Sequence, residues 1–168
     1  MSLRLILTRH AKSSWDDPTQ DDHDRTLNTR GQRAAPAIGA WLHAHGHIPA
    51  EVVSSTARRT LETWELLAPE LGNGMVMRRD PELFHATPEA MLRALQGCAA
   101  SPLLMIGHNP GIAEFAARLL SRPPRHPRFD TYPTCATLVA EFDAADWADV
   151  EFGTGRPVDF VVPKDLTD

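Results

Sequence analysis

Short aliphatic runs alternate with segments of helical spacing along the whole chain. The aliphatic runs predict strands at residues 3–8, 52–53, 75–77, 102–106, 137–142 and 158–162. Apolar positions three and four residues apart predict helices over residues 29–42, 59–67, 88–95 and 112–120, the second of them ending before Pro69. Because strands and helices alternate, the pattern predicts an α/β fold, a three-layer sandwich with a largely parallel central sheet.

The composition is typical of one globular domain. The 168 residues are 42% hydrophobic and 23% charged, which is enough apolar material for a full core and excludes a disordered chain. We find no internal repeat and no domain boundary, and the one break in composition is the segment 122–128, so residues 1–168 are expected to form a single domain. The net charge is −5, from 17 Lys and Arg against 22 Asp and Glu, which argues against a nucleic acid partner.

Cysteine usage and hydropathy indicate where the protein works. Cys98 and Cys135 lie far apart and form no CxxC pair, so the sequence predicts neither a disulfide framework nor a cysteine zinc site. No apolar run approaches the roughly 20 residues that span a membrane. The first apolar stretch is too short and too soon interrupted by charge for a secretory signal. We therefore expect a cytoplasmic protein with no membrane partner.

Polar residues follow three of the predicted strands at the point where each strand ends. Arg9 and His10 follow the first strand, residues 54–59 follow the second, and residues 107–109 follow the strand at 102–106. The carboxyl ends of parallel strands meet at one edge of a sheet, where α/β proteins bind their ligands. Two histidines and two arginines from separate strand ends are therefore expected to converge there.

Such a set of side chains is suited to phosphoryl chemistry. Two guanidiniums offer forked donors that match a phosphoryl dianion. An imidazole beside them can attack phosphorus and form a phospho-enzyme, while a second imidazole stabilises charge on the equatorial oxygens. Side-chain cations then supply the positive charge, so we expect neither a metal nor another cofactor. The sequence contains no P-loop, GxGxxG or HExxH motif that would favour different chemistry.

Five ordered segments resemble the histidine phosphatase superfamily, which has the phosphoglycerate-mutase-like fold. They are residues 5–13 (LILTRHAKS), 24–31 (DRTLNTRG), 55–63 (STARRTLET), 107–111 (GHNPG) and 132–136 (YPTCA). Together they span most of the chain. The alanine that follows the Arg-His pair, where other members have glycine, is similar to the small phosphohistidine phosphatase branch.

The resemblance implies a role for each matching residue. His10 is the implied nucleophile, Arg9 its neighbouring phosphate clamp and His108 the second imidazole. Counting along residues 55–63 places Arg59 in the second arginine position and makes Arg58 an exposed residue at the start of a helix.

The remaining assignments are less closely defined by the motifs. Ser13 and Asn109 are expected either to contact the phosphate or to hold their turns, and the sequence leaves both roles open. Larger members use a loop glutamate to protonate the leaving oxygen. Glu82 is the nearest equivalent here, with His85 as its rival. The small branch can lack a defined acid, because the imidazole of a phosphoramidate leaves more easily than an alkoxide. If Glu82 is the acid, Glu82→Gln should cripple phosphomonoester hydrolysis and spare a phosphoramidate.

Three features depart from the family pattern or lie outside it. Cys135 replaces a glycine of the late motif and is expected to be a small buried thiol. The acidic stretch 16–24 is either a solvated loop, a partner that orders Arg25, or a feature that repels excess anions. The basic, proline-rich segment 122–128 is either a solvated connection or a rim that attracts a negatively charged substrate.

The sequence therefore predicts a metal-independent phosphatase that acts through a phosphohistidine intermediate. Its expected substrate is phosphohistidine in a protein. The alternatives are a phosphatase of small phosphorylated molecules with the same residues, and a non-catalytic regulator that only binds phosphate or a phosphoprotein. All three have a phosphorylated protein or a small phosphorylated molecule as partner.

Overall fold

A six-stranded mixed sheet forms the centre of the computed structural model, which describes residues 2–167. Its strands are β1 (Leu3–Arg9), β2 (Glu51–Ser54), β3 (Met77–Arg79), β4 (Leu103–Gly107), β5 (Thr137–Phe142) and β6 (Arg156–Val161). They lie in the order β3-β2-β4-β1-β5-β6. The strands β3, β2, β4 and β1 run parallel to one another. The strand β5 is antiparallel to β1, and β6 is antiparallel to β5.

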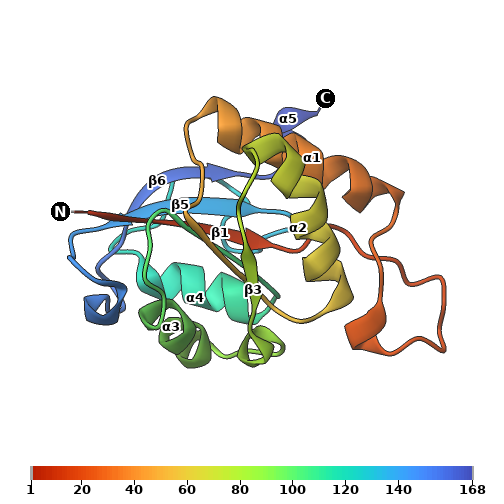
Figure 1. Cartoon of the computed structure of the whole chain (residues 1–168), viewed down its shortest axis with the longest axis horizontal. Helices are drawn as coiled ribbons and strands as arrows, with labels where there is room; N and C mark the ends of the chain where they lie inside the picture. Colours follow the sequence, from red (N-terminus) through yellow and green to blue (C-terminus); the bar gives the residue numbers. More distant parts are fainter. Residues whose placement is uncertain (1, 168) are drawn as a thin grey trace.

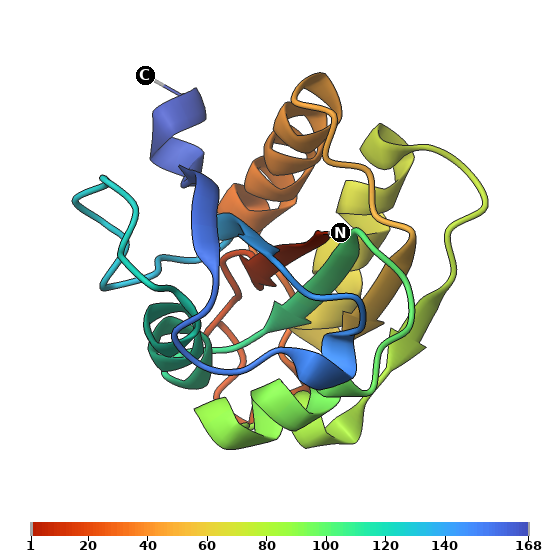
Figure 2. The ribbon, with the colours of Figure 1, turned by 90° about the vertical axis from the view of Figure 1, so that its left-hand side faces the viewer.

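Helices cover both faces of the sheet (Figures 1 and 2). The helices are α1 (Thr29–Ala44), α2 (Arg58–Leu71), α3 (Pro88–Gln96), α4 (Gly111–Leu119) and α5 (Pro163–Leu166). The pair α1 and α2 packs on one face with α5 beside α1, and α3 and α4 pack on the other. Two clusters of buried apolar side chains fill the space between sheet and helices. The predicted three-layer α/β sandwich is thus confirmed.

The second helix and the third strand differ from their predicted bounds. The helix α2 continues through Pro69 to Leu71, because Leu67 and Leu71 lie four residues apart on its buried face and a proline so close to the end of a helix removes only one backbone hydrogen bond. The strand β3 begins at Met77, which pairs with Val52, so its register follows β2 and not the local apolar run. The short helix α5 was not predicted. Within residues 2–167, no helix is long and apolar enough to cross a membrane.

The central strands bring the polar segments to one edge of the sheet. In the parallel pair β1 and β4, Arg9 pairs with Gly107, and in the pair β2 and β4, Ser54 pairs with Ile106. All three strands therefore end at the same level. The residues that follow them, His10, Ser55 and His108, leave the sheet side by side.

The loop after β1 packs tightly against the start of α1. A Cβ atom added at Gly31 would lie 2.2 Å from the carbonyl oxygen of Lys12, which is backbone and cannot swing aside. Gly31→Ala is therefore expected to lower the free energy of unfolding by about 2–3 kcal/mol, as measured by urea denaturation. The exposed neighbour Gln32 provides the control. If Gly31→Ala were as stable as Gln32→Ala, this packing would not constrain the loop that carries His10.

Candidate active site

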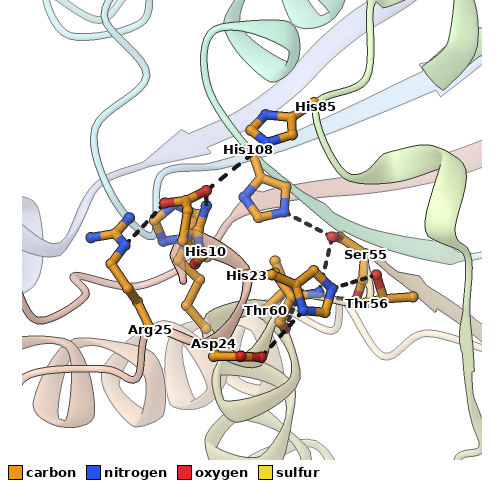
Figure 3. Close-up of polar contacts among 12 residues, drawn as sticks. His10, His23, Asp24, Arg25, Ser55, Thr56, Thr60, His85 and His108 are labelled. Atoms are coloured by element: carbon orange, nitrogen blue, oxygen red, sulfur yellow. Dashed lines mark hydrogen bonds and ion pairs between the residues drawn. The ribbon is translucent and has the colours of Figure 1, made fainter. Parts of the chain in front are cut away.

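His10 and His108 face each other at the carboxyl edge of the sheet (Figure 3). Their ring centroids are 5.3 Å apart and their planes are tilted by 52°. The backbone N–H of His10 donates to the carbonyl oxygen of Gly107 (3.1 Å), and the N–H of Ser55 donates to that of Ile106 (3.1 Å). These bonds extend the ladders of the sheet by one residue and hold both loops where they start.

The surroundings of His10 fix its tautomer. Its ring Nδ1 lies 2.7 Å from the carbonyl oxygen of Ala11, which can only accept, so Nδ1 carries the hydrogen. The side chain is almost completely buried, and burial, with the neighbouring cationic groups, holds the pKa of His10 well below its usual value of 6.5. At neutral pH the ring is therefore uncharged, and Nε2 keeps its lone pair.

Ser55 is the hydrogen-bond partner of the His108 ring. Its Nε2 lies 2.8 Å from the hydroxyl oxygen of Ser55, and that oxygen accepts from the backbone N–H of Ala57 (3.3 Å). The hydroxyl of Ser55 can donate to Nε2, and in that arrangement the hydrogen of the neutral ring lies on Nδ1. Burial, followed by the charge of Arg59, lowers the pKa of His108 to about 3. His108 is an uncharged donor at neutral pH.

The guanidiniums of Arg9 and Arg59 lie beside the two histidines, and these four side chains form the candidate catalytic group. Arg9 donates from Nη1 to the carbonyl oxygen of Tyr132 (3.1 Å), and Arg59 donates from Nη1 to the carbonyl oxygen of Asp22 (2.6 Å). Burial and the charge of Arg59 lower the pKa of Arg9. Arg59 is only 5% exposed, whereas Arg58 is exposed at the first residue of α2. The structure therefore brings Arg59, and not Arg58, to the histidine pair.

Three donors in this group have no partner. Within residues 2–167, the buried side-chain nitrogen or oxygen atoms that lack a hydrogen bond are Nε of Arg9, Nε of Arg59 and Nδ1 of His108. An unpaired buried donor costs about 1–3 kcal/mol, so three of them on one group of residues need a common explanation. All three are donors, and an anion that accepts from them would satisfy the whole set.

The two low histidine pKa values predict how stability depends on pH. In the unfolded chain these residues take up protons as the pH falls below 6.5, while in the folded protein His10 and His108 stay neutral. As the pH falls from 6.5 towards the pKa of the residue in the folded protein, each of these histidines therefore lowers the free energy of unfolding by about 1.4 kcal/mol per pH unit. Urea denaturation at pH 7 and pH 5 measures the effect. His108→Asn should show a smaller loss between the two pH values than the wild type, and equal losses would contradict the assignment.

Asp22 is a site residue that sequence reasoning did not single out. It lies in a short 3₁₀ helix inside the acidic stretch, where its carboxylate accepts from Nη2 of Arg59 (3.2 Å) and from Nε of Arg25 (3.0 Å). Its pKa is lowered by these two cations, which outweigh the effect of its partial burial. The acidic side chains of the stretch are exposed, as expected for a solvated loop, and the contact of Asp22 also orders Arg25. The guanidinium of Arg25 in turn stacks on the exposed ring of Trp15 at 3.4 Å.

Phe84 forms an apolar wall beside the polar group. Its ring meets His108 edge-on at 5.4 Å and also contacts His85, with the guanidinium of Arg59 5.9 Å from its centroid. A single phenylalanine in a predicted loop gives no indication in the sequence that it lines a site. Ser55 carried a stronger signal, since it stands at the start of a motif segment, but no role was predicted for it.

The other expected residues lie in different surroundings. Ser13 is buried and pairs its backbone with Leu27 in an isolated bridge. The amide nitrogen of Asn109 donates to the carbonyl oxygens of Thr131 (2.9 Å) and Tyr132 (3.2 Å), which corresponds to the turn-holding alternative.

The two candidates for the general acid, Glu82 and His85, differ in their contacts with the residues around Arg59. Glu82 is exposed, and no hydrogen bond or ion pair joins its carboxylate to any residue in the range 2–167. His85 is also exposed, but its Nε2 comes within 4.0 Å of the Asp22 carboxylate (Figure 3 shows His85 near His108). In this structure His85, and not Glu82, contacts the group around Arg59.

Metal binding has no candidate in the described part of the chain. No group of three or more His, Cys, Asp or Glu side chains within residues 2–167 is placed to hold an ion. The guanidiniums and imidazoles described above are therefore the cationic and donor groups that an anionic ligand would meet.

The comparisons with known proteins agree with this geometry. The model of the histidine phosphatase superfamily (branch 1) matches residues 5–85. The uncharacterized protein Rv1276c of Mycobacterium tuberculosis is 32% identical over 163 residues, which cover 93% of this chain and 99% of that protein. The chain belongs to the histidine phosphatase superfamily. Membership makes it a phosphatase with a phosphorylated substrate.

Solved structures place this histidine phosphatase near the small SixA proteins. SixA from Agrobacterium tumefaciens is 26% identical with a TM-score of 0.77, and the match covers 96% of this chain and 98% of that one. The protein histidine phosphatase SixA solved with tungstate has a TM-score of 0.80 at 20% identity, covering 98% and 100%, and this likeness shows the fold. The phosphoglycerate-mutase-like fold and the SixA-like branch expected from the motifs are confirmed.

Membership gives Cys135 a physical context. The residue is buried, as predicted, and its backbone N–H donates to the carbonyl oxygen of His10 (2.9 Å). Its φ of 61° lies in the left-handed region that favours glycine, which accounts for the glycine that the family pattern has at this position.

Proposed function

We propose that this histidine phosphatase removes the phosphoryl group from phosphohistidine in a protein, without a metal, through a phosphohistidine intermediate on His10. Nε2 of His10 attacks phosphorus in line, and the P–N bond to the substrate imidazole breaks with its electron pair going to that imidazole, which takes a proton from solvent. Water then attacks the phosphorus of phospho-His10, and inorganic phosphate and free His10 result. Arg9, Arg59 and His108 hold the equatorial oxygens in both steps.

The observation that carries this proposal is the set of three unpartnered donors around a neutral imidazole. Nε of Arg9, Nε of Arg59 and Nδ1 of His108 can each donate to an oxygen of one phosphoryl group. His10 meets the requirement for a nucleophile, because Ala11 holds the hydrogen on its Nδ1 and its low pKa keeps Nε2 unprotonated.

The leaving group favours a phosphoramidate over a phosphomonoester. An alkoxide needs a strong acid in place, and Glu82 is exposed and without contacts to the catalytic group. An imidazole leaves more easily, so the reaction does not depend on such an acid. The names of the similar SixA proteins support the same substrate class.

The cytoplasmic location and the single domain expected from the sequence remain predictions.

The test is a paired hydrolysis assay in the presence of EDTA. The substrates are a phosphohistidine peptide and p-nitrophenyl phosphate, compared by kcat/KM. We expect both to be hydrolysed and the phosphohistidine peptide to be preferred. Hydrolysis of the ester alone would replace the proposal with a small-molecule phosphatase. Phosphate binding without turnover of either substrate would leave a binding regulator.

An alkyl phosphomonoester, added as a further substrate in the same assay, tests whether Glu82 acts as the general acid. Glu82→Gln should leave the kcat/KM for the phosphohistidine peptide unchanged, because that leaving group needs no acid from the protein. If Glu82→Gln lowered turnover of both substrates alike, Glu82 would act in the phosphohistidine reaction too. A loss confined to the alkyl ester would keep Glu82 as an acid for esters only.

A further inference from the structure

A cavity lies outside the group formed by Arg9, His10, Arg59 and His108, and residues of α1 and α5 line it. Figure 1 shows α5 beside α1. Its volume is about 300 Å³, which is within the range of small-molecule sites. Its walls come from the loop after β1, the first half of α1, the segment 128–134 and the start of α5. None of the residues that hold the phosphoryl group in the proposed reaction lines it.

Five cationic side chains surround this cavity, and no acidic residue lines it. The cations are Lys12, Arg30, Arg33, Arg128 and Lys164. Within residues 2–167, no ion pair or side-chain hydrogen bond engages any of the five. Half of the other arginines form ion pairs, namely Arg4, Arg25, Arg59, Arg78, Arg118 and Arg156. In a protein of net charge −5, this is a strong local excess of positive charge.

The nearest carboxylate in sequence has hydrogen-bond partners of its own. Asp165 follows Lys164 directly, but its Oδ2 accepts from the backbone N–H of Val162 (3.0 Å) and pairs with Nε2 of His126 (2.8 Å). The same contact occupies the histidine of the basic segment 122–128. Against the effect of its partial burial, these hydrogen bonds and the charge of Arg128 lower the pKa of Asp165, but Asp165 does not line the cavity. An anion that enters the cavity would therefore meet five cationic side chains and no lining carboxylate.

Apolar side chains make up the rest of the wall. Ala34 and Ala37 lie on the same side of α1, and Pro133 and Val162 lie across from them on other segments. Inorganic phosphate alone would leave this apolar surface uncovered. A ligand with an apolar body would bury it and gain the usual hydrophobic stabilisation.

We propose that this cavity binds a small organic anion, one with at least two negative charges on a compact apolar body. The site is separate from the catalytic group but closely linked to it by the backbone. Lys12 is two residues beyond His10, and Pro133 follows Tyr132, whose carbonyl oxygen accepts from Arg9. The five cations meet the charged groups of the ligand, and the alanines, Pro133 and Val162 meet its body.

Phenylphosphonate tests the proposal, because it carries two charges on an aromatic ring and cannot be hydrolysed at its P–C bond. It would be titrated into the full chain while backbone amide resonances are followed by NMR. We expect saturable shifts at the amides of Arg33, Ala34 and Lys164. These shifts report the cavity separately from any binding at His10 and His108. Inorganic phosphate should saturate the same amides at higher concentration, because it lacks the apolar body.

The double variant Arg33→Gln/Lys164→Gln removes two charges from the rim. It should weaken phenylphosphonate binding at the cavity by about tenfold, or about 1.4 kcal/mol, and leave hydrolysis of p-nitrophenyl phosphate unchanged. Arg93→Gln, which changes an equally exposed arginine on α3, should have no effect on either. Three results would overturn the proposal: no saturable shift at the cavity amides, equal binding by the double variant, or equal affinity for inorganic phosphate and phenylphosphonate.

Discussion

Replacing His10 with alanine is expected to lower kcat for the phosphohistidine peptide and for p-nitrophenyl phosphate by about 10⁴-fold or more. The variant keeps the donors of Arg9, Arg59 and His108 and should still bind phosphate. It loses the atom that forms the bond to phosphorus, and no other uncharged imidazole lies in the same place. Steady-state kinetics measures the loss of kcat. The intermediate is measured by mixing the wild type with labelled substrate, quenching the reaction rapidly and counting the acid-labile label that stays on the protein.

The matched control for this variant is another histidine with similar local bonding. His45 also places Nδ1 against a backbone carbonyl, that of Trp41 at 2.8 Å, but it is exposed at the end of α1. His45→Ala should retain full activity and full labelling. Labelling that persisted in His10→Ala would assign the nucleophile to a different residue and refute the proposed course.

Arg59→Ala is expected to lower kcat/KM by about 10³-fold, because it removes a buried forked donor to the phosphoryl oxygens. The neighbouring Arg58 has the same side chain on the same turn of α2 but is exposed to solvent. Arg58→Ala should therefore stay within about twofold of the wild type, on the scale expected for an exposed side chain without bound partners. The pair separates the geometry of the site from the overall charge of the helix.

Folding has to be measured alongside, since Arg59 also bonds with Asp22. Arg59→Lys keeps a positive charge and most of the side-chain volume, but it loses the fork that can hold two oxygens. We expect it to fold like the wild type and to recover only a small part of the activity. Full activity in Arg59→Lys would mean that charge alone is needed at this position.

The sequence was sufficient for the parts of the molecule that periodicity and strand ends determine. Residues 5–8 of the first aliphatic run are buried on both faces of the sheet, and the strand ends at Arg9, so the strand and the edge that carries the candidate site were predicted together. The exposed Arg58 and buried Arg59 were also distinguished by counting along the motif. In these cases one local pattern carries both the structure and the chemistry.

The remaining parts depend on contacts between distant segments, which no local pattern encodes. Asp22 reaches Arg59 across 37 positions of the chain, and its stretch looks like any other acidic loop. Phe84 becomes a wall of the site only because its loop returns to His108. The register of β3 was set by β2, and the position of Pro69 in α2 was set by buried leucines on both sides of it.

Asp22 bears on how the catalytic cycle ends. Its carbonyl and carboxylate oxygens accept from the two terminal nitrogens of Arg59, which are donors that a phosphoryl group would also use. In the proposed reaction, the aspartate would take the place of the departing inorganic phosphate on the guanidinium, so the buried cation would keep an anionic partner. Product release in that reaction would then be an exchange of one anion for another, and free phosphate should be held less tightly than two arginines alone would hold it.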